Sequence, residues 1–310
     1  ISGSIMDAPI MRSRSVFSKS FRSRQNGQPS FFSNASVTGM VYIFSSINFD
    51  TAFRFSDSMA IISHSERKIK PNSVRTYESD MNELVFARNS QFDLAKIFDC
   101  GQCFRFERTD EREETCSFEG VAYDRYLYAS QTDSAVTVRY SGKRDDAFVF
   151  RYFDLETDYA AIARSFMSDP VLARASKLAR GIRILRQEPW ETLCSFIISQ
   201  NNNIPRIKKI IRTLSEAYGE QISLPDGRVF FAFPTAHALK KAGSEALYAC
   251  GTGFRAKYLS SAAEMVSDNP FFLTETAALP TVEAAENLKR IKGVGDKVAA
   301  CTLLFGLARY

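Results

Sequence analysis

The residues with the clearest potential for chemistry lie near the end of the chain, in Gly293-Val-Gly-Asp-Lys-Val-Ala-Ala-Cys301. Gly293 and Gly295 permit a tight turn with positive φ, and Asp296 is a good N-cap for a following helix. Lys297 falls in the first turn, where the positive end of the helix dipole favours the neutral, nucleophilic amine. The segment predicts a phosphate-binding hairpin and a candidate lysine nucleophile, although such a lysine is more often a solvated charge.

Two polar segments elsewhere could contact a nucleic acid. Gln200-Asn-Asn-Asn-Ile-Pro-Arg206 follows a strongly apolar helix and offers many side-chain donors and acceptors. Gly251-Thr-Gly-Phe-Arg-Ala-Lys-Tyr258 places Phe254 and Arg255 after a glycine turn, where an aromatic ring could wedge between bases. The alternatives are an asparagine-rich capping loop with solvated bases, and a buried phenylalanine that anchors its turn.

The elements that must position these residues change in type near Tyr152. Alternating apolar and polar residues predict strands, and apolar residues at helical spacing predict helices. A short helix or turn is predicted at 90–98, and strands at 103–107, 115–122, 125–130 and 135–140. Helices are predicted at 157–167, 170–179, 189–200, 205–218, 235–242, 245–249, 256–268, 271–279, 281–291 and 296–307. We expect an α+β fold, an antiparallel sheet domain (81–155) before an all-helical domain (156–310).

Residues 1–80 differ from the rest of the chain. They hold ten Lys/Arg and six Asp/Glu, whereas the other 230 residues hold 30 and 29, so most of the net charge of +5 lies in this segment. Met11–Arg24 is basic and serine-rich like a transit peptide, but the segment has no sustained periodicity. We expect residues 1–80 to be a leader that is disordered or not native, and any nucleic-acid surface to be a local patch.

The cysteines and histidines exclude several kinds of site. Six scattered cysteines do not form a disulfide scaffold, and two histidines with one C-x-x-C, Cys100-Gly-Gln-Cys103, do not supply a zinc or iron–sulfur site. A redox role for this pair would require a βαβ context that the sequence does not show. No apolar run reaches membrane-spanning length, so no membrane partner is expected.

Five motifs, in order and spacing, resemble the 8-oxoguanine DNA glycosylases of the helix–hairpin–helix superfamily. They cover about Met81 to Tyr310 and read Gly101-Gln-Cys-Phe-Arg105, Arg183-Ile-Leu-Arg-Gln-Glu-Pro189, Ser195-Phe-Ile-Ile-Ser-Gln-Asn-Asn-Asn-Ile-Pro-Arg-Ile207, Gly251-Thr-Gly-Phe-Arg-Ala-Lys-Tyr258 and Gly293-Val-Gly-Asp-Lys-Val-Ala-Ala-Cys301. The resemblance implies base-excision repair of 8-oxoguanine opposite cytosine, with an associated lyase step that cuts the strand by β-elimination.

The resemblance also assigns roles to the lesion site. Lys297 matches the lysine that attacks C1′ and forms a Schiff base after the damaged nucleotide has flipped out of the duplex. Gly101 matches the glycine whose carbonyl accepts the N7–H of 8-oxoguanine. Cys301 is similar to the cysteine that lies against the flipped base.

The remaining roles concern the DNA. Asn201 matches the asparagine that fills the vacated space, Arg206 and Arg255 match the pair that reads the orphaned cytosine, and Phe254 stands where the family often has a tyrosine wedge. The hairpin residues are Gly293, Val294 and Gly295, with a monovalent cation implied beside a backbone phosphate and no other cofactor. The implied partner is double-stranded DNA containing 8-oxoguanine, bound by a monomer. The implied compartment is the bacterial cytoplasm or nucleoid, or a eukaryotic nucleus or mitochondrion.

The chain also departs from the family pattern. The family places an essential aspartate shortly after the lysine-bearing helix, but the 13 residues after Lys297 contain no acid, so we expect a C-terminally truncated glycosylase that is weakly active or inactive. Three alternatives stay open: a non-catalytic or impaired DNA-binding fragment, an alkylated-base glycosylase that uses water, and a redox protein that cycles Cys100 and Cys103. Lys297 argues against the water-using enzyme.

Overall fold

A computed structural model describes residues 74–76, 81–109 and 116–309, all within the unit Ser36–Tyr310. The predictions for residues 1–73 fall outside this described part.

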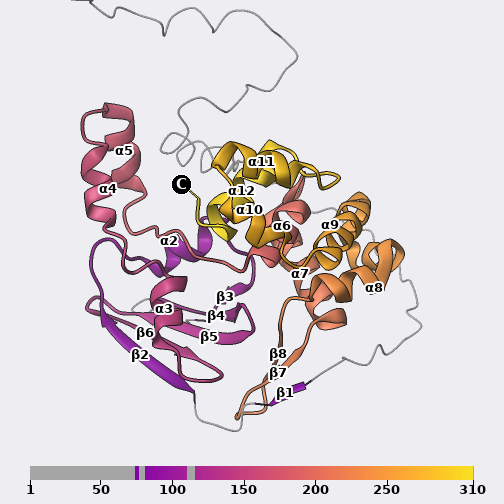
Figure 1. Cartoon of the computed structure of the whole chain (residues 1–310). Helices are drawn as coiled ribbons and strands as arrows, with labels where there is room; N and C mark the ends of the chain where they lie inside the picture. The colour runs from indigo at the N-terminus through magenta and orange to yellow at the C-terminus, as the bar shows by residue number, and fades with distance from the viewer. Residues whose placement is uncertain (1–73, 77–80, 110–115, 310) are drawn as a thin grey trace, which may run out of the picture. The chain divides into compact units, whose positions relative to one another are not determined.

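The first half of the described chain forms a five-stranded antiparallel sheet (Figure 1). Its strands are β2 (Asn82–Ala87), β3 (Phe106–Arg108), β4 (Cys116–Ala122), β5 (Arg125–Gln131) and β6 (Ala135–Tyr140), in the order β2-β6-β5-β4-β3. The residues of β2 and β6 alternate between more buried and more exposed positions, as expected for strands with one face on a core. The antiparallel sheet prediction is confirmed, and β2 is a strand that the sequence reasoning did not identify.

Two short helices cover one face of this sheet. They are α2 (Leu94–Asp99), capped by Asp93, and α3 (Asp146–Tyr152), capped by Asp145. Leu94, Phe98 and Phe148 pack there against buried side chains of the strands, and Phe98 stacks on Phe106 with ring centroids 4.3 Å apart. Helix α3 is not among the predicted helices, because it lies just before Tyr152, where the helical pattern of the sequence begins.

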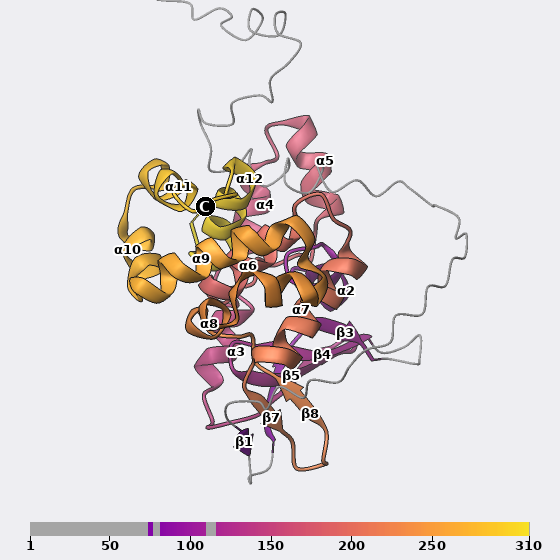
Figure 2. The same cartoon turned by 90° about the vertical axis from the view of Figure 1, so that its right-hand side faces the viewer.

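The second half is mainly helical and surrounds a separate apolar core (Figure 2). Its helices are α4 (Tyr159–Ser165), α5 (Pro170–Leu178), α6 (Pro189–Ser199), α7 (Ile204–Tyr218), α8 (Ala236–Leu247), α9 (Ala256–Asp268), α10 (Phe272–Ala278), α11 (Thr281–Lys289) and α12 (Asp296–Cys301). The central helix α6 is buried along most of its length, because almost all its residues after Pro189 are apolar or small. The α+β class and the sheet-then-helices order are confirmed.

The helical half also contains strands, which is a correction to the expectation of an all-helical domain. A hairpin of β7 (Gln221–Ser223) and β8 (Val229–Phe231) pairs in parallel with β1 (Val74–Thr76), so three residues of the segment 1–80 belong to the fold. Ile222 of this hairpin packs with Val121 and Tyr126 of the five-stranded sheet. Strands of three residues are too short to show a clear alternation in the sequence.

Polar side chains also join the sheet to the helices. The guanidinium of Arg105, beside β3, donates to Ser215 Oγ (2.9 Å) and to the carbonyl of Phe231. Lys208 Nζ donates to the carbonyl of Phe106 (2.6 Å). Lys208 and Arg212, which follow the asparagine segment on α7, both pair with Glu107. These interactions hold α7 against β3.

Candidate active site and DNA interface

A helix, a glycine turn and a second helix form the predicted hairpin. Helix α11 ends at Lys289, and the chain reverses through residues 290–295 before α12 begins at Asp296. The apolar side chains of Ile291 and Val294 are buried and anchor the turn to the helical core. After Cys301 the helix continues as a wider π-helical segment, Thr302–Gly306, which packs with α12 on α6.

The two hairpin glycines have different roles. Gly293 has φ = 85°, and a Cβ at this position would lie 2.3 Å from the ring of Tyr258. Gly295 has φ = −101° and open space where a Cβ would lie. Only Gly293 is therefore required by backbone conformation and close packing.

Two expectations for the hairpin need correction. The N-cap of α12 is Gly295, and Asp296 is the first helical residue, with its carboxylate 3.0 Å from Lys289 Nζ. The amide of Val294 donates to the carbonyl of Ile291 (3.0 Å), so it does not point outward to a phosphate. Within the described part of the chain, the amides of Gly295 and Asp296 donate to no acceptor, which leaves them open to an anion.

Lys297 is exposed at the start of α12, and Cys301 lies one turn later on the same helix. Burial raises the pKa of the Cys301 thiol to about 12, although the nearby Lys297 lowers it. The thiol therefore stays protonated at neutral pH. The structure thus brings an exposed amine and a neutral, buried thiol to one side of one helix.

Gly101 lies in a buried turn that hydrogen bonds tie to the lysine-bearing helix. Gly101 has φ = 79°, and the neighbouring Gln102 side chain donates to the carbonyls of Ile97 and Arg183 (2.8 and 2.9 Å). Gln187 Nε2 donates to the carbonyl of Gln102 (2.7 Å), and the Gln187 amide donates to the carbonyl of Phe305 (2.9 Å). Gln102 and Gln187 belong to the first and second of the five motifs. The motifs alone do not predict the hydrogen bond between them, because the two residues are 85 positions apart in the sequence.

The asparagine segment forms a turn between α6 and α7. Asn203 caps α7 through its side chain, which accepts the Arg206 amide (3.0 Å). Asn201 is exposed and has φ = 47°, a left-handed conformation that asparagine tolerates better than most residues. The turn therefore presents the Asn201 side chain to solvent at the end of a rigid helix.

Arg255 is buried (2% exposed) against this turn, which differs from a guanidinium free to read a base. It donates to the carbonyls of Gln200, Asn201 and Thr252, and burial lowers its pKa, with a further contribution from the charge of Arg206. Arg206 itself is exposed, and its guanidinium has no partner among the residues that the structure describes.

Phe254 is 53% exposed and lies between this turn and the hairpin. Its ring packs edge-on against Tyr258, with centroids 6.0 Å apart, and Arg255 stacks 4.4 Å above it. The ring of Tyr258, a residue without a predicted role, also packs against Gly293. Contacts therefore connect the hairpin, Phe254, Arg255 and Asn201, and the charge of Arg206 acts on Arg255.

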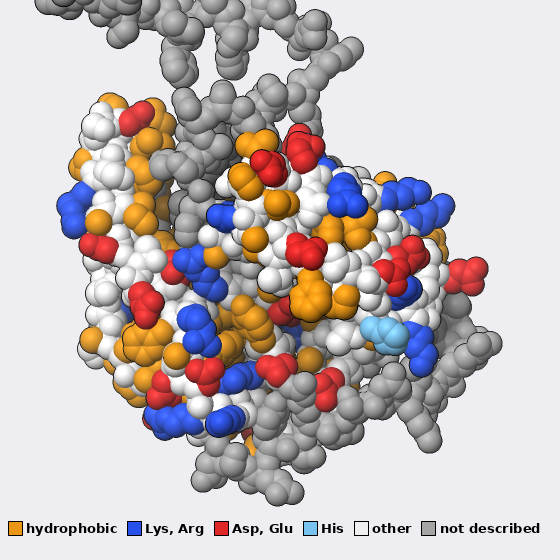
Figure 3. Space-filling view, viewed as in Figure 1, with side chains coloured by type: hydrophobic (Ala, Val, Ile, Leu, Met, Phe, Trp, Pro, Cys, Tyr) orange, Lys and Arg blue, Asp and Glu red, His pale blue; other side chains and the backbone are white. Residues whose placement is uncertain are grey.

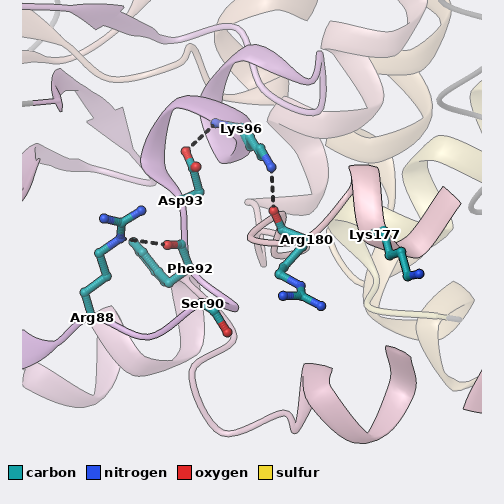
Figure 4. A pocket seen from close by; sticks show the side chains of 7 residues that line it. All are labelled: Arg88, Ser90, Phe92, Asp93, Lys96, Lys177 and Arg180. Carbon is teal, nitrogen blue, oxygen red and sulfur yellow. Dashed lines mark hydrogen bonds between the residues drawn. The ribbon is translucent and has the colours of Figure 1, made fainter. Parts of the chain in front are cut away.

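None of the predicted site residues lines either of two cavities in the described part of the chain. One cavity of about 500 Å³ is lined by Arg88, Lys96, Lys177 and Arg180 together with Ser90, Phe92 and Asp93 (Figure 4). The other, of about 290 Å³, lies along Glu107, Lys208 and Arg212. On the face seen in Figure 3, bases and acids are interspersed, in agreement with the balanced charge of residues 81–310.

The thiols argue against the redox alternative. Cys100 and Cys103 form no disulfide, burial raises the pKa of Cys100 to about 11, and burial also raises the pKa of Cys103. A redox cysteine needs an accessible thiolate. Within residues 74–76, 81–109 and 116–309, no cluster of three His, Cys, Asp or Glu could hold a metal ion, and no helix there could cross a membrane.

Comparisons with known proteins agree with this architecture. Residues 84–193 match the family "8-oxoguanine DNA glycosylase, N-terminal domain", and residues 194–300 match the "HhH-GPD superfamily base excision DNA repair protein" family.

Two named relatives cover most of the described chain. The N-glycosylase/DNA lyase of Saccharomyces cerevisiae is 32% identical over 241 residues, 70% of this chain and 64% of the yeast protein. The N-glycosylase/DNA lyase OGG1 of Arabidopsis thaliana is 29% identical over 233 residues, 72% of this chain and 62% of the plant protein. The chain therefore spans less than two thirds of the length of either relative.

A solved structure is also similar. The Clostridium acetobutylicum 8-oxoguanine glycosylase/lyase, in complex with dsDNA containing cytosine opposite to 8-oxoG, superposes with a TM-score of 0.68 at 34% identity. The match covers 75% of this chain and 80% of the bacterial one.

Proposed function

We propose that this chain, which belongs to the 8-oxoguanine DNA glycosylase family, excises 8-oxoguanine opposite cytosine from double-stranded DNA. The observation that supports this proposal most directly is the exposed Lys297 amine. It lies one helical turn from the buried Cys301, on the helix that follows the glycine hairpin. The proposed partner is duplex DNA, bound by one copy of the chain.

In the proposed reaction the Lys297 amine attacks C1′ of the flipped nucleotide, the C1′–N9 bond breaks, and the base leaves after taking up the proton that the nitrogen loses. The C1′–O4′ bond then breaks, O4′ is protonated and the nitrogen lone pair forms the iminium. The iminium withdraws electrons from the sugar, so a proton leaves C2′, the C3′–O bond breaks and the 3′ phosphate is expelled by β-elimination. Water could replace the base, but it would not leave an iminium. An amine nucleophile therefore accounts for coupled base removal and strand cleavage.

Recognition of the lesion is assigned to the turn beside Gly101. Its carbonyl would accept the N7–H that distinguishes 8-oxoguanine from guanine, and Cys301 would lie against the base. The Gln102 and Gln187 hydrogen bonds support this assignment, because they fix the Gly101 turn relative to the helix that carries Lys297.

The cluster around Phe254 is assigned to the DNA. Phe254 would enter the base stack, Asn201 would fill the space of the flipped base, and Arg206 would contact the orphaned cytosine. The open amides of Gly295 and Asp296 would receive a backbone phosphate. Carbonyl oxygens of Lys292, Gly293 and Val294, which accept no hydrogen bond from the described residues, would hold a monovalent cation that adds positive charge there.

The proposal is tested by assaying strand cleavage of duplexes with 8-oxoguanine opposite each of the four bases. Lys257 gives a matched control for Lys297, because each is the exposed second residue of its helix. We expect cleavage to be fastest opposite cytosine, lost in Lys297→Ala and retained in Lys257→Ala. Base release that survives Lys297→Ala would indicate a water-using glycosylase, and binding without any chemistry would indicate a DNA-binding protein.

A further inference from the structure

The cavity of about 500 Å³ lies outside the proposed active site and DNA interface (Figure 4). One wall is formed by residues 88–96, which lead into α2, and the other by residues 177–183 at the end of α5. Four of the seven residues that line the cavity are bases, namely Arg88, Lys96, Lys177 and Arg180, and only Asp93 is acidic. Residues 81–310 as a whole hold 30 bases and 29 acids, so this cavity is a local concentration of positive charge.

Hydrogen bonds and close packing hold the two walls together. The Asp93 amide donates to the carbonyl of Gly181 (2.9 Å), and the Arg183 guanidinium donates to the carbonyl of Gln91 (3.2 Å). Gly181 has φ = 97°, and a Cβ at this position would lie 2.6 Å from the Cβ of Asp93. The cavity therefore has a defined shape before any ligand binds.

Two of the four bases are fixed by the walls. Lys96 Nζ donates to two carbonyls at the end of α5 (2.8 and 3.4 Å). The Arg88 guanidinium donates to two carbonyls (3.3 and 3.4 Å) and lies 3.6 Å from the exposed Asp133. An ammonium group has three N–H donors and a guanidinium has five, so both groups retain donors beyond these bonds. Lys96 and Arg88 therefore supply positive charge at fixed positions.

The other two bases are available to a ligand. Lys177 and Arg180 are exposed, and their side chains have no hydrogen-bond or ion-pair partner among the residues that the structure describes. The exposed Ser90 hydroxyl adds a donor on the first wall. The planar fork of arginine and the compact charge of lysine both suit phosphate oxygens. A preformed cavity with two fixed and two free bases is suited to an anion that carries several charges.

The lining favours phosphate groups over the bases of a nucleic acid. Phe92 is the only aromatic residue that lines this cavity, and it is 2% exposed, so its ring offers no face on which a base could stack. A volume of about 500 Å³ is that of a small-molecule site. A concave site of this kind also matches a compact anion better than it matches the convex backbone of a duplex.

We propose that this cavity binds a compact oligophosphate, either the triphosphate chain of a nucleotide or a short inorganic polyphosphate. Lys177 and Arg180 bind the phosphate oxygens, and Lys96 and Arg88 contribute fixed positive charge. The site uses none of the residues assigned to base excision, so it goes beyond the proposed function and does not depend on it.

The first test measures the affinity of the full chain for inorganic triphosphate at low ionic strength by isothermal titration calorimetry. One variant combines Lys177→Gln with Arg180→Gln. The charge-matched control combines Arg164→Gln with Arg174→Gln, which removes two exposed bases of α4 and α5 that do not line the cavity. We expect binding to weaken roughly tenfold or more in the first variant and less than about twofold in the control. Equal affinity losses in the two variants, or a wild type that does not bind triphosphate at about 1 mM, would overturn the proposal.

The second test locates the bound triphosphate by hydrogen exchange. We expect triphosphate to slow exchange several-fold in peptides from the two walls, 88–96 and 177–183, and to leave the peptide 290–297 unchanged. Slower exchange confined to 290–297 would show that triphosphate binds the open amides of the hairpin, and would contradict the proposal.

Further titrations distinguish the two sources of phosphate and the proposed DNA interface. Tighter binding of adenosine and cytidine triphosphates than of inorganic triphosphate would support a nucleotide as the ligand, and tighter binding of longer inorganic chains would support a polyphosphate. An undamaged duplex that displaces triphosphate from the two walls would assign the cavity to DNA and overturn the proposal. A wild type that cleaves no 8-oxoguanine duplex would refute the proposed function, and the triphosphate titrations would still decide the role of the cavity.

Discussion

At the scale of single residues, the hydrogen-bond and ion-pair partners of a side chain distinguish those that serve the fold from those available to a ligand. Arg255 is a base in a motif that suggested DNA contact, and Lys208 and Arg212 closely follow another, yet the protein's own carbonyls and Glu107 occupy all three. Arg206 and Lys297 remain exposed. The sequence predicts which residues are basic, but the partner of each long side chain depends on packing between distant segments.

Phe254 is an exposed aromatic residue whose removal should affect DNA binding and leave the fold intact. Phe271, 68% exposed beside α10, is a matched control because it lies outside the proposed interface. Stacking on a base contributes about 1–3 kcal/mol, so Phe254→Ala should weaken duplex affinity roughly tenfold. Phe254→Tyr should restore it, and Phe271→Ala should have no effect. Equal affinity losses for Phe254→Ala and Phe271→Ala would contradict an intercalating role.

At the scale of elements, the hairpin depends on one of its glycines. Gly293→Ala must hold φ = 85° and displace the Tyr258 ring, so we expect it to lower the free energy of unfolding by about 1–3 kcal/mol. Gly295→Ala meets neither obstacle and should change it by less than about 0.5 kcal/mol. Denaturant unfolding of both variants measures the difference. Equal destabilisation by the two substitutions would contradict this account of the turn.

Most helices could be located from the sequence, whereas several short elements could not. Helix α9 and strand β6 begin and end where predicted, because long apolar periodicity and clear turn residues mark them. The strands β7 and β8 and helix α3 carry too few residues for a periodic signal. Gly295 replaced Asp296 as N-cap because the Asp296 carboxylate pairs with Lys289 of the preceding helix, a contact that only the folded hairpin creates.

At the scale of the whole molecule, a buried ion pair links the sheet to the helical core. Glu191 in α6 lies 3.9 Å from Arg105 beside β3. Burial raises the pKa of Glu191 to about 7, an effect that Arg105 opposes and Glu188 reinforces. The carboxyl group is therefore neutral in the folded protein at mildly acidic pH. Its ionisation as the pH rises lowers the free energy of unfolding.

This arrangement predicts a pH dependence of stability. The folded pKa is raised, so the stabilisation is complete below the unfolded value of about 4.5 and is lost as the pH rises through about 7. Relative to Glu191→Gln, the wild type should lose up to about 3 kcal/mol of unfolding free energy over this range. Denaturant titrations of both proteins from roughly pH 4 to pH 8, a range that includes both the unfolded and the folded pKa, measure this loss of unfolding free energy. Parallel curves would contradict the assignment to Glu191.

The central claim is that the Lys297 amine reacts with the sugar, and borohydride trapping on a duplex with a preformed abasic site opposite cytosine tests it most directly. The aldehyde of such a site condenses with a placed amine without any base to expel, so the result does not depend on the rate of base excision. We predict a covalent protein–DNA adduct for the wild type and Lys257→Ala, and none for Lys297→Ala. An adduct that persists in Lys297→Ala, or is absent from the wild type, would contradict the account.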